Sequence, residues 1–330
     1  MFGINILGTG SYAPELTITN DDMAKVVETS DDWISTRTGI KSRHYSNGEL
    51  TWQLGAKAAQ NAIEAAGISP EEIGLVVFST ITPDFSTPSC ACMVQNAVGA
   101  VNAAAFDLNA ACTGFVYSLD TAKRFLQTDE SLKYVLVVSA EVLSRIVDFN
   151  DRTTCILFGD GAGAVVIERS EKLYSSYLSA DGSGNKFLYA RNNAPTHPFR
   201  TSEGNNYGED FTLDTGYLFQ DGKEVYKFAT KALPTASSKA AEKIGFDIKT
   251  ADWFIPHQAN IRIIETAAKN FGVPMDKFIT NLDRYGNTSS ASMAIAFDEA
   301  VRDGRVQKGQ KICFVGFGAG LTLGSIILEY

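Results

Sequence analysis

The second half of this chain repeats the order of segments found in its first half. The corresponding segments are 76–80 and 253–257, 134–140 and 312–320, and 164–168 and 325–329. A repeat on this scale indicates two similar halves that pack face to face. We place the boundary near 169–180 and take 1–172 and 173–330 as the N-terminal and C-terminal halves.

Each half alternates strand-like and helix-like segments. Residues 75–80 form a continuous apolar run, which is typical of a parallel strand covered on both faces. Residues 54–66 and 113–127 have apolar residues near helical spacing instead. This alternation predicts an α/β fold.

The segment 106–115 places a cysteine where a strand-like run gives way to a helix-like run. Cys112 has small neighbours and is followed by Gly114, so the backbone can turn sharply and a substrate can come close. A thiol at a helix N-terminus faces unpaired N–H groups and the positive end of the helix dipole, which favour the nucleophilic thiolate. Taken alone, the stretch fits a buried structural cysteine equally well.

A histidine and an asparagine follow comparable segments in the second half. His257 comes directly after an apolar run, and catalytic groups of open α/β sheets gather beyond the carboxyl ends of strands. Asn287 follows Gly286, in a turn equivalent to that of Cys112, although helix capping also explains an asparagine there. The repeat predicts that Cys112, His257 and Asn287 converge where the halves meet.

Composition narrows the classes of function. A formal net charge of −9 over 330 residues argues against a nucleic-acid binder. Five irregularly spaced cysteines and three histidines argue against a metal site and indicate a reducing, cytoplasmic compartment. Residues 1–5 lack the basic segment of a signal peptide, so none is expected.

Two segments need separate interpretation. The uncharged run 312–328 is long enough to suggest a membrane span, but its four glycines favour two buried strands joined by a turn, and we expect no membrane association. Residues 189–219 are rich in Asn, Gly, Thr and aromatic residues, without periodicity. Such a stretch is either disordered or a functional cover over a site.

Five motifs are spread nearly from end to end of the chain, at 32–40, 110–115, 158–163, 256–260 and 286–289. Together they resemble the β-ketoacyl-acyl carrier protein synthase III family of the thiolase superfamily. The resemblance implies a five-layered α/β/α/β/α fold, a homodimer, and a decarboxylating Claisen condensation of an acyl-coenzyme A primer with malonyl-acyl carrier protein. This reaction initiates fatty acid biosynthesis, and it implies no cofactor beyond the coenzyme A thioester substrate.

The resemblance assigns roles to the three converging residues. Cys112 would accept the acyl group as a thioester, which splits one difficult step into two. His257 Nε2–H and the Asn287 amide would donate hydrogen bonds to the enolate formed when the malonyl group loses carbon dioxide. The backbone N–H groups of Cys112 and Ala319 would form a second oxyanion site.

The resemblance also implies contacts with coenzyme A. Trp33 and Arg152 would flank the adenine, and Arg37 would meet a phosphate, because guanidinium groups suit both tasks. A surface ion pair for the arginines and a core anchor for Trp33 are the structural alternatives.

Carrier-protein contacts are implied on the segment after His257. Arg262 would contact the acidic carrier protein. Lys227 and Lys231 are further candidates, although a solvated helix face explains these lysines as well.

Three residues depart from the family pattern. Ala319 stands where glycine is expected, which keeps the backbone N–H but narrows the pocket slightly. Thr87 stands where some relatives carry a bulky aromatic residue that closes the acyl pocket from the partner subunit. Threonine would leave more room, enough to admit primers longer or more branched than acetyl, but the sequence does not fix primer length or branching. Lys223 stands where some relatives direct asparagine toward the pantetheine arm.

Three alternative functions remain open at this point. Thr87 and the segment 189–219 fit a specialised condensing or acyl-transfer enzyme of secondary metabolism. A cysteine hydrolase would also carry Cys, His and Asn in this order, but the repeat and the small-residue turn argue against it. An inactive partner subunit would usually lack the nucleophile, which is present here.

Overall fold

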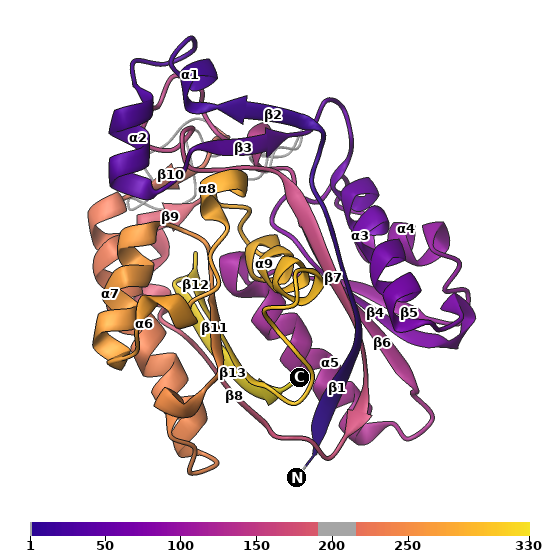
Figure 1. Ribbon diagram of the computed structural model, residues 1–330. Coiled ribbons are helices and arrows are strands. Elements are labelled where there is room, and N and C mark those ends of the chain that lie inside the picture. The colour runs from indigo at the N-terminus through magenta and orange to yellow at the C-terminus, as the bar shows by residue number, and fades with distance from the viewer. Residues whose placement is uncertain (1, 191–215) are drawn as a thin grey trace, which may run out of the picture.

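The structure, a computed structural model, describes residues 2–190 and 216–330 and stacks two sheets with three layers of helices (Figure 1). The first sheet has the order β1-β7-β6-β4-β5. Its strands are β1 (Gly3–Tyr12), β4 (Ile73–Ser79), β5 (Ala104–Leu108), β6 (Tyr134–Glu141) and β7 (Gly161–Ser170). The second sheet has the order β11-β12-β13-β8. Its strands are β8 (Tyr174–Ala180), β11 (Trp253–Pro256), β12 (Lys311–Gly318) and β13 (Thr322–Glu329).

Helices cover both sheets and fill the space between them. The outer face of the first sheet carries α3 (Thr51–Ala66) and α4 (Cys90–Ala97), and that of the second carries α6 (Gly222–Glu242) and α7 (Ile261–Phe271). The central layer is α5 (Gly114–Thr128) and α9 (Ala291–Arg302), which lie between the sheets in Figure 1. These five alternating layers confirm the predicted α/β/α/β/α fold.

A smaller group of elements lies at one end of the stack. It contains the hairpin of β2 (Leu16–Thr19) and β3 (Ser42–Tyr45) with the helices α1 (Asn20–Met23), α2 (Asp31–Thr38) and α8 (Leu282–Tyr285). This end of the molecule also holds β9 (Leu188–Tyr189) and β10 (Phe219–Gln220), which pair with each other.

The strand pairing repeats between the halves. In the first sheet β6 runs parallel to β4 and antiparallel to β7, and in the second β12 runs parallel to β11 and antiparallel to β13. The chain passes from the first sheet to the second between Ser170 and Tyr174, close to the boundary placed at 172. The run 312–328 forms β12 and β13, two buried strands, as predicted.

The repeat is incomplete at one edge of the second sheet. Phe278 forms only an isolated bridge with Phe254, where the first half has the complete strand β5. The next backbone groups are taken up by a side chain, because Gln258 donates to Ile279 O and accepts from the Asn281 N–H. The expected counterpart of β5 is therefore a short extended segment.

The buried central layer gives the site a rigid base. The Phe314 ring of β12 packs edge-on against Phe115 of α5 and Phe297 of α9, with ring centroids 5.5 and 5.2 Å apart. All three rings are fully buried. Because both helices are held between two sheets, their N-terminal ends have little freedom to move.

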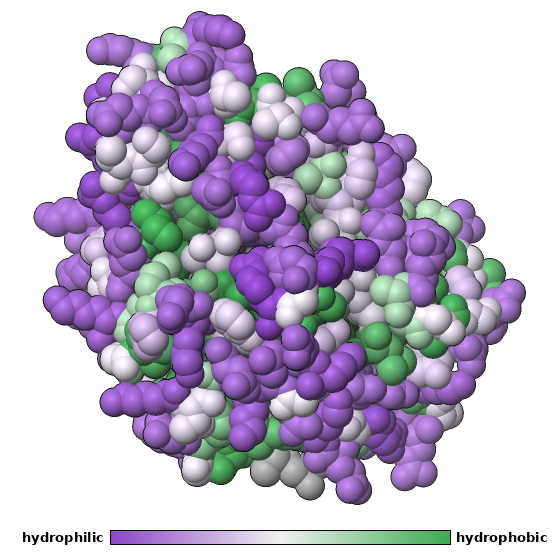
Figure 2. All heavy atoms as spheres, in the orientation of Figure 1, coloured by the Kyte–Doolittle hydropathy of each residue, from purple (hydrophilic) through white to green (hydrophobic). Residues whose placement is uncertain are grey.

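The face in Figure 2 is mostly hydrophilic, with hydrophobic residues in small separate groups. Within 2–190 and 216–330, no helix is long and apolar enough to cross a bilayer. Of the segment 189–219, residues 191–215 lie outside the described residues, so its role as a cover stays a prediction.

Candidate active site

A cavity of about 1030 Å³ opens beyond the carboxyl ends of strands from both sheets. Residues that follow β4, β5, β6, β11 and β12 line it, so both halves contribute to its walls. Cys112, His257 and Asn287 all lie in this lining, together with Leu188 and Leu218 from either end of the irregular segment. The structure thus brings the three predicted residues to one place.

Cys112 lies in a tight turn between β5 and α5. The Asn109 side chain accepts a hydrogen bond from the Ala111 N–H at 3.2 Å, and Ala111 has a φ of 47°. A 3₁₀ turn, Ala111–Thr113, then leads into α5 at Gly114, where a Cβ would collide with Ser79 Oγ. The small residues around Cys112 are therefore required by close packing.

Asn287 lies in a turn of the same construction. Its Oδ1 accepts a hydrogen bond from the Ser289 N–H at 2.9 Å, and Ser289 has a φ of 48°. Since a backbone N–H only donates, this contact identifies the remaining amide atom of Asn287 as the N–H₂ donor. The two turns are equivalent as predicted, but Asn287 corresponds to Asn109 within them, and Ser290 corresponds to Cys112.

His257 is oriented by a hydroxyl on α9. Its Nδ1 lies 2.8 Å from Ser292 Oγ, which also accepts a hydrogen bond from the Gln258 N–H at 3.3 Å. Because the oxygen already accepts from Gln258, the Ser292 proton can be donated to Nδ1, which leaves the imidazole proton on Nε2. Burial lowers the pKa of His257 to about 3, so the ring is neutral near pH 7.

The ionisation of Cys112 differs from the expectation. Burial raises the pKa of the Cys112 thiol to about 12, while a hydrogen bond with Ser289 Oγ at 3.4 Å acts in the opposite direction. Only 8% of Cys112 is exposed, so loss of water opposes the charge strongly. The helix N-terminus does not make this thiol ionise readily in the resting site.

The predicted backbone oxyanion residues come from two segments that pack against each other beside the cavity. Cys112 and Ala319 both line it, and the end of β12 packs tightly on the cysteine turn. A Cβ at Gly318 would lie 2.7 Å from Cys112 N. Glycine at 318 therefore sets how closely the two backbones approach.

The candidate coenzyme A residues cluster at the outer end of α2. The guanidinium carbons of Arg37 and Arg152 lie 4.6 and 5.1 Å from the Trp33 ring centroid. Arg262 on α7 donates to Thr36 O at 2.8 Å, which joins this cluster to the helix after His257. The structure thus places the candidate coenzyme A and carrier-protein residues on adjoining surfaces.

The remaining predicted residues do not reach the cavity within this chain. Thr87 and Lys223 are exposed and absent from its lining, although their neighbours Ser86 and Val225 belong to it. The prediction for Thr87 concerns the acyl pocket of a partner subunit and not the cavity of its own chain. Lys227 and Lys231 are exposed on α6.

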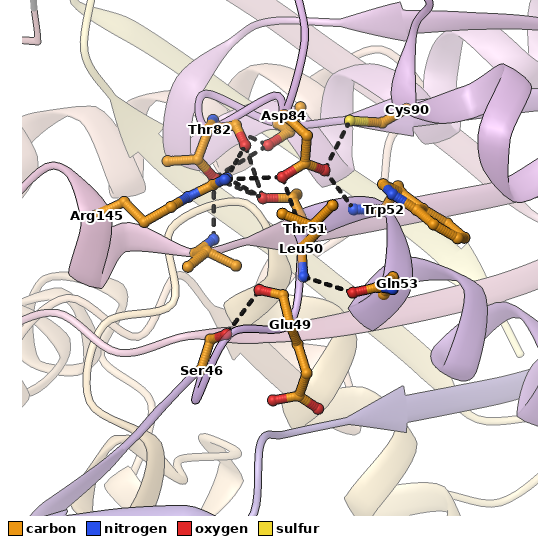
Figure 3. Close-up of polar contacts among 12 residues, drawn as sticks. Ser46, Glu49, Leu50, Thr51, Trp52, Gln53, Thr82, Asp84, Cys90 and Arg145 are labelled. Carbon is orange, nitrogen blue, oxygen red and sulfur yellow. Dashed lines mark hydrogen bonds and ion pairs between the residues drawn. The ribbon is translucent and has the colours of Figure 1, made fainter.

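The loop that carries Thr87 is anchored by an ion pair (Figure 3). Arg145 reaches Asp84 at 2.8 Å and also donates to Thr51 Oγ1 and Thr82 O. Asp84 in turn accepts the N–H groups of Thr51 and Trp52 at the start of α3. Arg145 and Asp84 line the cavity, and the sequence interpretation did not identify them.

Three serines and a buried glutamate were also missed. Ser289, Ser290 and Ser292 follow Asn287 directly, and the run of hydroxyl residues after Gly286 was a usable signal. Glu141, which accepts a hydrogen bond from Ser290, follows an apolar strand with no local motif.

Comparison with known proteins identifies the family. A model described as 3-oxoacyl-[acyl-carrier-protein (ACP)] synthase III matches residues 106–182, and the model of its C-terminal part matches 241–330. The β-ketoacyl-[acyl-carrier-protein] synthase III of Clostridium acetobutylicum is 50% identical, over 100% of this chain and 99% of its own. This chain belongs to the β-ketoacyl-acyl carrier protein synthase III family. It is an acyltransferase of the condensing type, and the cysteine hydrolase is excluded.

Solved structures of synthase III relatives support the same assignment. The 3-oxoacyl-[acyl-carrier-protein] synthase III from Aquifex aeolicus VF5 has a TM-score of 0.90 and 40% identity, covering 99% of this chain and 100% of its own. The priming β-ketosynthase from the R1128 polyketide biosynthetic pathway has a TM-score of 0.88 and 36% identity, covering 99% and 96%.

Proposed function

We propose that this enzyme condenses an acyl-coenzyme A primer with malonyl-acyl carrier protein and so initiates fatty acid biosynthesis. The observation that carries the proposal is the convergence of Cys112, His257 and Asn287 on one cavity. A thiol nucleophile beside two neutral donors suits a reaction that forms a thioester and then an enolate.

In the first step Cys112 Sγ attacks the thioester carbon of the primer. A new carbon–sulfur bond forms, coenzyme A leaves as its thiolate, and that thiolate takes up the proton given up by Cys112. Ser289 Oγ, 3.4 Å from Sγ, supports the developing thiolate by turning its own proton toward the sulfur. The backbone N–H groups of Cys112 and Ala319 stabilise the tetrahedral oxyanion.

In the second step the malonyl group loses carbon dioxide. The electron pair of the broken carbon–carbon bond becomes an enolate on the thioester. His257 Nε2–H and Asn287 Nδ2–H donate hydrogen bonds to its oxygen. The enolate carbon then attacks the acyl carbon on Cys112, the carbon–sulfur bond breaks, and Cys112 leaves as its thiolate, which takes up a proton from solvent. No cofactor is required, because coenzyme A and the carrier supply both thioesters.

The pH dependence of the second step tests the state of His257. Burial lowers the pKa of His257 from 6.5 to about 3. The part of the free energy of unfolding that depends on a neutral His257 is therefore complete above pH 6.5 and is lost as the pH falls toward 3. We expect the rate of carbon dioxide release by the acyl-enzyme to show no loss centred near an ordinary histidine pKa of about 6.5. Single-turnover measurements between about pH 5 and 8 would check this, and a decline centred in that interval would contradict a neutral His257.

Substrates are proposed to enter past α2 and α7. The Trp33 ring, flanked by Arg37 and Arg152, offers an aromatic face and two cations to an adenine nucleotide. Arg262 is exposed beside this cluster, where an acidic carrier protein can dock.

The enzyme is further proposed to be a cytoplasmic homodimer. All five cysteines are free thiols, which fits a reducing compartment. Strand β5 forms an edge of the first sheet, and exposed Val101 and Phe125 adjoin it. Edge strands with apolar neighbours favour pairing with a second chain, and a partner would place Thr87 at the neighbouring site.

Intact mass spectrometry with a panel of acyl-coenzyme A thioesters tests the proposed function. Acetyl, straight-chain and branched primers should add their acyl mass to the protein, and malonyl-acyl carrier protein should then discharge it. The primer that loads most completely identifies the substrate class. Because of Thr87, we expect primers larger than acetyl to load. If no small primer loads while the thiol still alkylates, the specialised enzyme of secondary metabolism is the better assignment.

A further inference from the structure

Glu141, the last residue of β6, is a fully buried carboxylate that the proposed chemistry does not use. Its Oε2 accepts hydrogen bonds from Thr80 Oγ1, the Ile81 N–H and Thr82 Oγ1 at 2.8–3.0 Å. Its Oε1 accepts one from Ser290 Oγ at 2.7 Å. The donors that the described part of the chain supplies are all uncharged. Burial raises the pKa of Glu141, and the hydrogen bonds from Ser290 and 80–82 act in the opposite direction. Holding a charged carboxylate here without a cation is costly, so stability alone does not account for it.

The internal repeat gives Glu141 and Ser290 their counterparts in the catalytic half-site. Strands β6 and β12 each have eight residues and pair alike with the following strand, so Glu141 corresponds to Gly318. Ser290 corresponds to Cys112, because each follows a residue of positive φ in an Asn-capped turn. Gly318 has no side chain and packs directly against the Cys112 backbone, whereas Glu141 extends a carboxylate to Ser290.

We propose that Glu141 and Ser290 form the closed counterpart of the catalytic half-site, in which Glu141 is a positioning residue that holds the Asn287 turn through Ser290. The carboxylate ties the pocket wall at 80–82, in the N-terminal half, to a turn of the C-terminal half. That turn carries Asn287 and also Ser289, which contacts Cys112 Sγ. The inference rests on the role proposed above for Asn287.

The charge of Glu141 also acts on the nucleophile. After burial, the negative charge of Glu141 is a further cause of the raised pKa of the Cys112 thiol. Charged or titratable groups on the segments that adjoin this pair include His257, Arg145, Asp84 and Asp160. Arg145 pairs with Asp84 and donates to Thr82 O (Figure 3). The charge of Glu141 is therefore not neutralised by a paired cation among the described residues.

Two substitutions separate the hydrogen bond from the charge. In Glu141→Gln the amide oxygen can accept the bonds from 80–82, and its N–H₂ can donate to Ser290 Oγ. The Ser290 proton then has Ser79 O, 3.3 Å from its oxygen, as acceptor. Ser290→Ala removes the link to the turn and keeps the carboxylate. Ser175→Ala is the matched control, because it removes another buried serine hydrogen bond, to Ala240 O, away from the cavity.

The experiment compares the two half-reactions and the alkylation of Cys112. Ser290→Ala should release carbon dioxide from malonyl-acyl carrier protein about tenfold more slowly. Acyl loading should slow less, by about threefold, because the same turn carries Ser289, which contacts Cys112 Sγ. Glu141→Gln should keep both rates within about threefold, and iodoacetamide should alkylate its Cys112 at lower pH than in the unmodified enzyme. Ser175→Ala should change neither half-reaction.

Two results would overturn the inference. The first is an unchanged rate of carbon dioxide release in Ser290→Ala. The second is that Ser290→Ala and Ser175→Ala slow both half-reactions to the same extent. If the pH dependence of Cys112 alkylation were unchanged in Glu141→Gln, the charge of Glu141 would have no effect on the Cys112 thiol. Failure of the unmodified enzyme to load or discharge an acyl group would instead count against the proposed function.

Discussion

Replacing Cys112 by alanine should abolish acyl loading and lower the condensation rate by about 10⁴-fold or more, as expected when a covalent nucleophile is removed. The alanine fits the same turn, because Cys112 is small and nearly buried and its neighbours already include two alanines. The fold should therefore survive, and the mass of the protein should stay unchanged after incubation with any acyl-coenzyme A. Intact mass spectrometry and a steady-state condensation assay measure the two effects.

Cys92 provides the matched control for this prediction. It is the one exposed cysteine of the five, whereas Cys112 is buried. Cys92→Ala should therefore lose a readily alkylated thiol without losing acyl loading. If acyl loading persisted in Cys112→Ala but disappeared in Cys92→Ala, the nucleophile would be Cys92 and the prediction would be wrong. Full condensation activity in Cys112→Ala would show that the reaction does not pass through a thioester on Cys112.

The architecture could be predicted because it follows from the order of apolar runs and the positions of glycines, which can be read from a single sequence. The repeated order of apolar runs fixed the correspondence of β6 with β12 and of β7 with β13, and strand pairing agrees with it. The glycines within 312–328 separated two buried strands from a membrane span. The missing counterpart of β5 was not visible, because the side chain of Gln258 takes up the backbone groups there.

The convergence of Cys112, His257 and Asn287 could also be predicted, whereas their protonation could not. Helix position alone favoured a thiolate at Cys112, but burial depends on how the second half covers the first. The Ser292 hydroxyl that orients His257 lies 35 residues further along the chain, and Glu141 lies 149 residues from Ser290. Contacts between such distant residues leave no local pattern, so they become apparent only in the folded chain.

Replacing Asn287 by aspartate should stop the second half-reaction while leaving the first intact. Aspartate keeps an oxygen for the Ser289 N–H, so the turn and the Ser289 contact to Cys112 are preserved. It replaces the N–H₂ donor with an anion beside the developing enolate, however. Loss of one such donor costs about 10²–10³-fold in rate, and the added repulsion should make the loss larger. Acyl loading, which does not form an enolate, should stay within about threefold.

Measuring carbon dioxide release and acyl loading on the same preparation distinguishes this role from a structural one. Asn287→Ala should slow carbon dioxide release by about 10²–10³-fold, but it also removes the acceptor of the Ser289 N–H, so its loading rate should fall as well. His257→Ala should resemble Asn287→Asp, because it removes the second donor without altering that turn. If Asn287→Asp released carbon dioxide at the unmodified rate, the amide would not contact the enolate, and His257 would be the remaining side-chain donor. The comparison works because Ser289 contacts Cys112 Sγ, whereas the proposed role of Asn287 is to donate to the enolate, although both lie in one turn.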